Sequence, residues 1–229
     1  MTVKGYQGVS IIDYPGRVAT VLYLGGCNFR CPFCHNPSLV LEPDTLPDLP
    51  LNEVISLLEE RAGFIDGVVI GGGEPLLDPI LPTLLKAIKG VVPSVKIDTN
   101  ASLPDKIEPL INKGLVDAWA VDIKTSPARY PIACGVKVDV EKVKAGLELI
   151  RRSGAPVEFR TTCLPDLVDS GDIEAIAWMI KGAERYVLQN FDPANALDPS
   201  FRKLTPYTPE EMYHLAETAR QHVERIEIR

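Results

Sequence analysis

Short runs rich in β-branched residues recur along the chain, separated by stretches with a different apolar spacing. "VATVLYL" and "GVVIG" are the first two runs, and valine and isoleucine favour strands. Runs of this kind predict six strands, over residues 18–24, 67–71, 94–98, 116–123, 157–163 and 185–191.

Between these runs, apolar residues recur three and four positions apart, which is the spacing of one face of a helix. The spacing predicts helices over residues 51–58, 81–88, 140–150, 173–180 and 212–219. A weaker helix is expected over 104–114, because Pro109 falls inside it. The Pro-rich stretch 42–50 is predicted to be a long loop before the first helix.

Strands that alternate with helices predict a parallel sheet with right-handed crossovers. Six such units form either an incomplete barrel or an open doubly wound sheet. No internal repeat, low-complexity segment or clear linker interrupts the 229 residues. A single domain over residues 1–229 is therefore expected.

Composition limits the classes of partner. The formal net charge is -7 and no run of Lys and Arg is present, so nothing attracts nucleic acid or anionic lipid in general. The N-terminal "MTVKGYQGVSIIDYPG" lacks the apolar stretch of a signal peptide, and no segment approaches the ~20 apolar residues that span a bilayer. We expect a soluble cytoplasmic protein without a nucleic-acid or membrane partner.

Polar residues gather where the predicted strands end. The segments concerned are the cysteines at 27–34, "GGGEP" (71–75), "DTN" (98–100), "DIK" (122–124), Arg160, and Gln189 with Asn190. Because the carboxyl ends of parallel strands lie on one face of a sheet, where ligands bind, we expect these segments to form one site.

The loop 25–36, "GGCNFRCPFCHN", holds Cys27, Cys31 and Cys34. "CPFCH" alone matches covalent haem attachment and "CPFC" alone resembles a redox dithiol, but neither interpretation uses Cys27. Structural zinc would require the adjacent residues Cys34 and His35 to bind one tetrahedral ion, and the chain has no second Cys/His pair.

Three thiolates on one short loop suit an iron-sulfur cluster in which one iron has no protein ligand, because full ligation of a [4Fe-4S] cluster takes four cysteines. The open iron is then a site for a substrate or cofactor. The remaining two cysteines, Cys134 and Cys163, stand apart from the loop and are expected to be ordinary buried packing.

The spacing C-x-x-x-C-x-x-C, with Phe33 before the last cysteine and "GGGEP" after the second strand, resembles the radical S-adenosylmethionine superfamily. The resemblance implies an incomplete (β/α)6 barrel, a partial TIM-type fold of parallel strands. It also implies that S-adenosylmethionine chelates the open iron of a [4Fe-4S] cluster held by Cys27, Cys31 and Cys34. The reduced cluster then cleaves the cofactor to a 5'-deoxyadenosyl radical.

The same resemblance gives the strand-end residues roles toward S-adenosylmethionine. The residues implied are Phe33, Gly72, Gly73, Glu74, Asp98, Thr99, Asn100, Asp122, Lys124, Arg160 and Asn190. The glycine turn and its carboxylate would meet the ammonium group, "DTN" the ribose, the D-x-K pair the methionine moiety, Arg160 the carboxylate and Phe33 the adenine. The same residues also have explanations that need no ligand. These are tight turns, helix caps, a surface ion pair and a solvent-facing arginine. His35 is expected beside the cluster or exposed.

"YQGVSIIDYPG", "GGGEPLL", "DTN", "DIK" and "LDPSFRKLTPYTPEEM" together resemble the activating proteins of anaerobic ribonucleoside-triphosphate reductase, which are close to pyruvate formate-lyase activases. This resemblance implies an oxidoreductase that takes hydrogen from a backbone glycine of that reductase, with a flavodoxin or ferredoxin as electron donor. Ala101 departs from the glycine that relatives often have, and Gln189 and Asn190 stand where formate-lyase activases place a histidine.

Other functions stay open. The enzyme could act on a small metabolite, or on another glycyl-radical enzyme such as pyruvate formate-lyase. A non-catalytic electron carrier is a further alternative, against which the glycine-rich turn and the polar strand ends argue.

Overall fold

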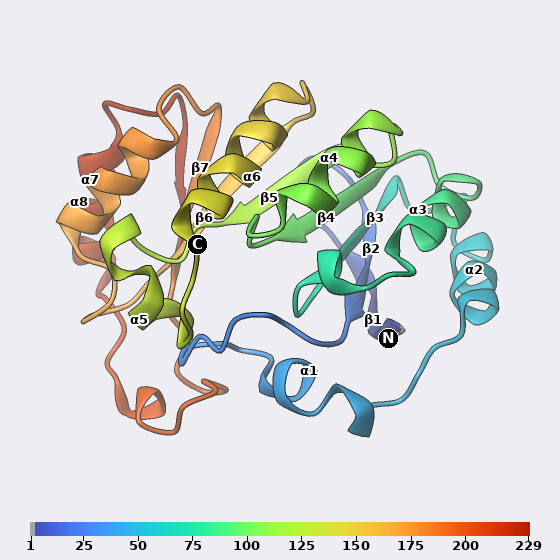
Figure 1. The fold of residues 1–229 in the computed structure, drawn as a ribbon, viewed down its shortest axis with the longest axis horizontal. Helices are drawn as coiled ribbons and strands as arrows, with labels where there is room; N and C mark the ends of the chain where they lie inside the picture. Colours follow the sequence, from blue (N-terminus) through green and yellow to red (C-terminus); the bar gives the residue numbers. More distant parts are fainter. Residues whose placement is uncertain (1–2) are drawn as a thin grey trace.

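Eight strands form one sheet in the computed structural model, which describes residues 3–229 (Figure 1). They follow chain order across the sheet: β1 Val3–Ser10, β2 Ala19–Leu24, β3 Gly67–Gly72, β4 Val95–Thr99, β5 Ala118–Asp122, β6 Val157–Cys163, β7 Arg185–Asn190 and β8 Ile226–Ile228. The six predicted strands are confirmed as β2 to β7, with ends that differ by no more than two residues.

The strands from β2 to β8 pair in parallel, each with the next along the chain. Their carboxyl ends therefore lie at one end of the sheet. β1 and β8 are its two edges, and each pairs with one neighbouring strand, β1 with β2 and β8 with β7. The predicted α/β fold, an incomplete parallel barrel, is confirmed.

The count of six strands was too low, because both edge strands lie outside the predicted units. β1 runs antiparallel to β2 and has register shifts near Gly5 and before Ser10, so its apolar pattern is irregular. β8 has only three residues and pairs with Tyr186–Leu188 of β7. Pairing with a neighbouring strand stabilises both edge strands, and neither has a regular apolar period that the sequence could reveal.

The main helices cover the outer face of the sheet (Figure 1). They are α2 Leu51–Glu59, α3 Leu81–Lys89, α4 Pro104–Asn112, α6 Val140–Arg152, α7 Ser170–Met179 and α8 Pro209–Ala219. All six predicted helices are thus present, including α4, which contains Pro109. Two five-residue helices were not predicted: α1 Pro37–Leu41 and α5 Tyr130–Cys134. The expected loop 42–50 contains a short 3-10 helix, Pro43–Thr45, and a bridge from Leu49 to β1.

Two apolar layers lie on the two faces of the strands. The larger one packs sheet against helices and includes Leu22 and Ile70. The smaller one lies inside the barrel and consists of Tyr14, Ala19, Val21, Val69 and Ala118, with Tyr23 beside it. The small inner layer leaves the carboxyl ends of the strands to polar side chains.

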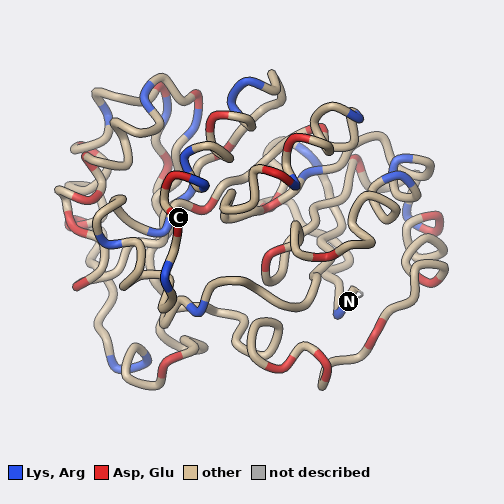
Figure 2. Tube along the Cα trace, viewed as in Figure 1, with Lys and Arg blue, Asp and Glu red and all other residues tan. Residues whose placement is uncertain are grey.

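Charges of both signs alternate around the outer helices (Figure 2). None of the helices within residues 3–229 is long and apolar enough to cross a membrane.

Candidate active site

One pocket of about 340 Å³ lies at the carboxyl ends of the strands, lined by the loop thiols and by the strand-end polar residues. Of the residues predicted for the site, it is lined by Cys27, Cys31, Phe33, Cys34, Gly72, Gly73, Asp98, Thr99, Asn100, Asp122, Lys124, Arg160 and Asn190. His35 and Gln189 also line it. The parallel topology thus brings together segments that are more than 150 residues apart, since Cys27 and Asn190 both line this pocket.

The three loop thiols differ in their surroundings. Burial raises the pKa of Cys27 to about 12 and also raises the pKa of Cys34. A hydrogen bond with the Cys134 thiol lowers the pKa of Cys31 and outweighs the effect of burial. The Lys124 ammonium acts in the lowering direction on all three. A cation beside three thiols favours their anionic form, which is the form that binds metal.

The glycine turn after β3 packs against the backbone of the cysteine loop. Glu74 N donates to Gly26 O at 2.8 Å, and Gly73 N donates to Leu24 O at 2.9 Å. A Cβ on Gly73 would lie 1.9 Å from Gly26 O, and Gly72 has a φ of +115°. Only glycine fits at these two positions. The turn therefore fixes the backbone next to Cys27.

Gly73→Ala should both destabilise the fold and displace the loop that carries Cys27. Because the added methyl group meets backbone rather than a flexible side chain, we expect the free energy of unfolding to fall by about 3 kcal/mol. Urea denaturation of the metal-free protein measures this loss. Gly63→Ala is the matched control, since a Cβ there meets nothing within 4 Å and should change stability by less than about 0.5 kcal/mol. Equal stability of both variants would show that the turn does not constrain the loop.

The Glu74 carboxyl lies behind the pocket wall rather than in it. It is 1% exposed and accepts hydrogen bonds from Leu76 N, Thr99 Oγ1 and Asn100 N at 3.1, 2.8 and 2.8 Å. Burial raises its pKa to about 7. The structure therefore gives Glu74 a role in joining the ends of β3 and β4, and contact with a cofactor ammonium stays a prediction.

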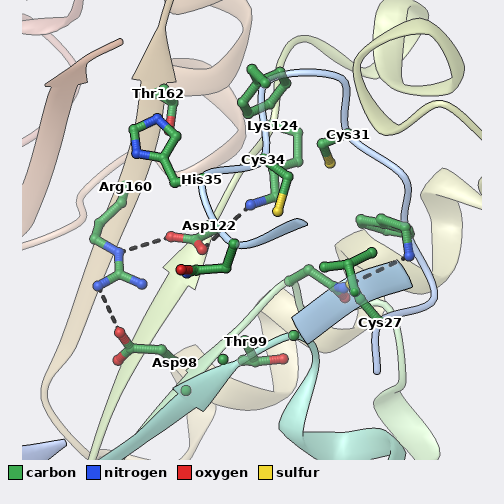
Figure 3. A pocket seen from close by; sticks show the side chains of 18 of the residues that line it. Cys27, Cys31, Cys34, His35, Asp98, Thr99, Asp122, Lys124, Arg160 and Thr162 are labelled. Carbon is green, nitrogen blue, oxygen red and sulfur yellow. Dashed lines mark hydrogen bonds and ion pairs between the residues drawn. The ribbon is translucent and has the colours of Figure 1, made fainter. Parts of the chain in front are cut away.

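Five charged side chains form a chain of ion pairs at the pocket floor. Figure 3 shows four of them, Asp98, Arg160, Asp122 and Lys124. Lys96 Nζ lies 2.6 Å from Asp98 Oδ1, and Asp98 Oδ2 lies 2.8 Å from Arg160. Arg160 Nε is 2.8 Å from Asp122 Oδ1, and Asp122 Oδ2 is 3.3 Å from Lys124 Nζ. Three cations face two carboxylates, so the chain carries a positive excess.

Arg160 was predicted to bind the carboxylate of a cofactor. In the structure its guanidinium forms ion pairs with two aspartates. Its Nε and Nη1 donate to Asp122 and Asp98, while its Nη2 donates to no described residue. Burial raises the pKa of Asp122, but the charges of Arg160 and Lys124 outweigh this and hold it below its usual range. Asp122 is therefore an anion, and one guanidinium nitrogen remains for a ligand.

The cysteine loop is also tied to the end of β4. Asn100 Nδ2 donates to Asn28 Oδ1 at 3.0 Å, and Asn28 Nδ2 donates to Ser102 Oγ at 2.8 Å. Ala101, between them, has a φ of +58°, a conformation that favours glycine. Ala101 therefore adopts a left-handed backbone conformation that costs a residue with a Cβ more free energy than it costs glycine.

The last strand contributes Asn190, whose side chain is already engaged. Its Nδ2 donates to Tyr207 O at 2.8 Å and its Oδ1 accepts from Phe191 N at 3.0 Å. His35 contacts the Phe191 ring at 6.0 Å between centroids. Both residues line the pocket, and the Asn190 side-chain amide is already hydrogen-bonded to Tyr207 and Phe191.

Sequence reasoning missed four contributors to the site. Asp13, Tyr23 and Thr162 line the pocket, and buried Lys96 supports Asp98 from below. Alternation along a strand could have identified Lys96, since it lies two residues before Asp98 and therefore on the same face of β4. Cys134 and Cys163 are both buried, as expected. Cys134 also contacts the cysteine loop through its backbone, where its carbonyl oxygen accepts a hydrogen bond from Arg30 N at 2.8 Å.

The donor set fits an iron-sulfur cluster better than a single ion. Among residues 3–229, no group of three or more His, Cys, Asp or Glu side chains is placed to hold one metal ion. A zinc site would need its thiolates about 2.3 Å from the ion. Three thiols spread along one wall, with a lysine facing them, instead suit a larger anionic group and leave space for a second ligand.

Comparison with known proteins agrees with this site. The model of the radical SAM superfamily matches residues 21–179. A protein of Methanocaldococcus jannaschii, provisionally named a glycyl-radical enzyme activating enzyme, is 34% identical over 99% of this chain and 95% of its own length. The pyruvate formate-lyase-activating enzyme of Clostridium pasteurianum is 29% identical over 78% of this chain and 76% of its own. A radical SAM methyltransferase from Sphaerobacter thermophilus shares the fold, with a TM-score of 0.75, 17% identity, and coverage of 96% of this chain and 68% of its own.

The fold and the pocket are those of a radical S-adenosylmethionine protein, a class that uses a [4Fe-4S] cluster and S-adenosylmethionine. Within this superfamily, the chain belongs to the family of glycyl-radical enzyme activating enzymes.

Proposed function

We propose that this protein activates an anaerobic ribonucleoside-triphosphate reductase by taking hydrogen from one of its backbone glycines. The observation that carries the proposal is the single pocket in which three loop thiols and the ion-pair chain meet, in a chain that matches an activating enzyme along almost its whole length. The bound cluster and S-adenosylmethionine supply the radical chemistry, with an electron from a flavodoxin or ferredoxin of the cytoplasm.

The residues of this chain hold and orient those groups. Cys27, Cys31 and Cys34 are the proposed cluster ligands, and Lys124 balances their negative charge. The guanidinium nitrogen of Arg160 that donates to no described residue is available to a carboxylate. Thr99 and Asn100 present polar groups where the ribose is proposed to bind.

A protein segment needs a route into this pocket. A second opening lies beside β1, and Tyr23, His35 and Asn36 line both cavities. The second cavity therefore lies next to the proposed cofactor site, at the open edge of the incomplete barrel, where an extended segment from another protein fits better than it would through a closed ring of strands.

The choice of reductase rests on the sequence resemblance and on the last strand. Gln189 and Asn190 line the pocket. The resemblance implies a histidine at this place in formate-lyase activases, and this chain has none there. Pyruvate formate-lyase is the second candidate, because its activating enzyme from Clostridium pasteurianum is a relative.

Anaerobic activation assays separate these partners. The reconstituted protein is incubated with S-adenosylmethionine, a chemical reductant and either the purified reductase or pyruvate formate-lyase, and the glycyl radical is measured by electron paramagnetic resonance. We expect a radical in the reductase, none in the formate-lyase, and none in a reductase whose radical glycine is replaced by alanine. A radical only in the formate-lyase would transfer the proposal to that partner. Cofactor turnover with a metabolite and no radical in either protein would contradict an activase.

A further inference from the structure

Lys96 is a buried cation beneath the pocket of the three thiols. It comes from β4, is 1% exposed and lies outside the lining of that pocket. Its Nζ donates to Asp98 Oδ1 at 2.6 Å and to Asp13 O, in the loop between β1 and β2, at 2.8 Å. Lys96 therefore influences a ligand in the pocket through the groups that it holds, and not by contact.

Two lysines each hold one oxygen of an aspartate that pairs with Arg160. Asp98 accepts from Lys96 at Oδ1 and from Arg160 Nη1 at Oδ2, at 2.6 and 2.8 Å. Asp122 accepts from Lys124 at Oδ2 and from Arg160 Nε at Oδ1, at 3.3 and 2.8 Å. Both aspartates thus lie beside the guanidinium, as Figure 3 shows, but each gives it one oxygen only.

The third nitrogen, Arg160 Nη2, belongs to both of the forks that a carboxylate can occupy. A guanidinium offers Nε with Nη2 along one side and Nη1 with Nη2 at its end, and carboxylates commonly take both nitrogens of such a fork. Here Asp122 takes Nε and Asp98 takes Nη1, and Nη2 donates to no described residue. Because the lysines hold the other two carboxylate oxygens, neither aspartate completes a fork.

We propose that Lys96 is a positioning residue for Arg160: by holding Asp98 Oδ1, it keeps Arg160 Nη2 free for the carboxylate of S-adenosylmethionine. Without Lys96, Asp98 can turn both oxygens toward Nη1 and Nη2, and this bidentate pair would compete with the cofactor. The inference rests on Arg160 binding the cofactor carboxylate, as in the proposed function, and is independent of which protein is activated.

The test removes Lys96 with and without the carboxylate through which it is proposed to act. Lys96→Met is compared with the wild type, and Lys96→Met with Asp98→Asn is compared with Asp98→Asn alone. Lys89→Met is the matched control, since Lys89 also pairs with an aspartate, Asp117, at 2.7 Å, but at the amino end of β5.

Each protein is reconstituted anaerobically, and its iron and sulfide are measured. Equilibrium binding gives the dissociation constant of S-adenosylmethionine, and cleavage under a chemical reductant gives kcat and KM. No partner protein is needed, so failure of the activation assay would not affect this result.

We expect the dissociation constant to rise about 3- to 30-fold in Lys96→Met, with a full cluster and with a larger change in KM than in kcat. In the Asp98→Asn background the same substitution should change it by less than about twofold, because asparagine has one acceptor oxygen and cannot occupy both nitrogens of the fork. Lys96→Gln keeps N–H donors for Asp98 and should weaken binding less than Lys96→Met. Lys89→Met should match the wild type.

Equal weakening in both backgrounds would overturn the proposal, because Lys96 would then act independently of Asp98. An unchanged dissociation constant in Lys96→Met with a full cluster would also overturn it. If circular dichroism shows that Lys96→Met does not fold, Lys96→Gln with and without Asp98→Asn makes the same comparison, and the same two outcomes decide it.

Discussion

Replacing Cys27, Cys31 or Cys34 by alanine should each remove the iron-sulfur cluster and, with it, all cleavage of S-adenosylmethionine. The three thiols line one pocket wall, and each would supply one iron ligand. No other cysteine can take their place there, since Cys134 and Cys163 are fully buried outside that wall. Iron and sulfide analysis after anaerobic reconstitution, together with the consumption of S-adenosylmethionine under reducing conditions, measures the loss.

The wild type should bind about four irons and four sulfides, and Cys163→Ala should retain both. Stoichiometric zinc in place of iron in the wild type would contradict the cluster. Full cleavage in any one of the three loop variants would remove that cysteine from the ligand set.

Arg160→Ala should weaken the binding of S-adenosylmethionine by about 2–4 kcal/mol, which is roughly 30- to 700-fold, without removing the cluster. The substitution takes the shared cation away from Asp98 and Asp122. Two carboxylates then face the pocket with less compensation and repel the carboxylate of the cofactor. Arg160→Lys should give a smaller loss, because an ammonium group cannot hold both aspartates as the planar fork does.

Equilibrium binding to the anaerobically reconstituted proteins measures this effect, with the cluster absorbance compared in each. Arg152→Ala is the control, because its ion pair with Glu148 lies on an exposed helix surface and should change affinity by less than about 0.5 kcal/mol. If Arg160→Ala bound the cofactor as tightly as the wild type with an intact cluster, the ion-pair chain would have no part in binding.

Local patterns in the sequence were enough to predict the inner strands and the outer helices. The runs that became β2 to β7 are rich in β-branched residues, and the helices show apolar residues three and four apart. These patterns predict the elements because each strand or helix buries one or both of its faces in the core, and the buried positions must be apolar. No such apolar period marks the edge strands β1 and β8 or the short helices α1 and α5. Contacts with neighbouring elements stabilise these four segments.

The sequence by itself also determined that the polar strand ends would gather, because parallel strands place their carboxyl ends on one face. Only the tertiary structure decided which side chains meet there. Glu74 accepts hydrogen bonds from Thr99 and Asn100 behind the pocket wall. Arg160 forms ion pairs with Asp98 and Asp122, which lie on two other strands. The carbonyl oxygen of Cys134 accepts a hydrogen bond from Arg30 N of the cysteine loop, 104 residues away along the chain. Such pairs depend on strand register and helix packing between distant segments, and no local apolar period encodes them.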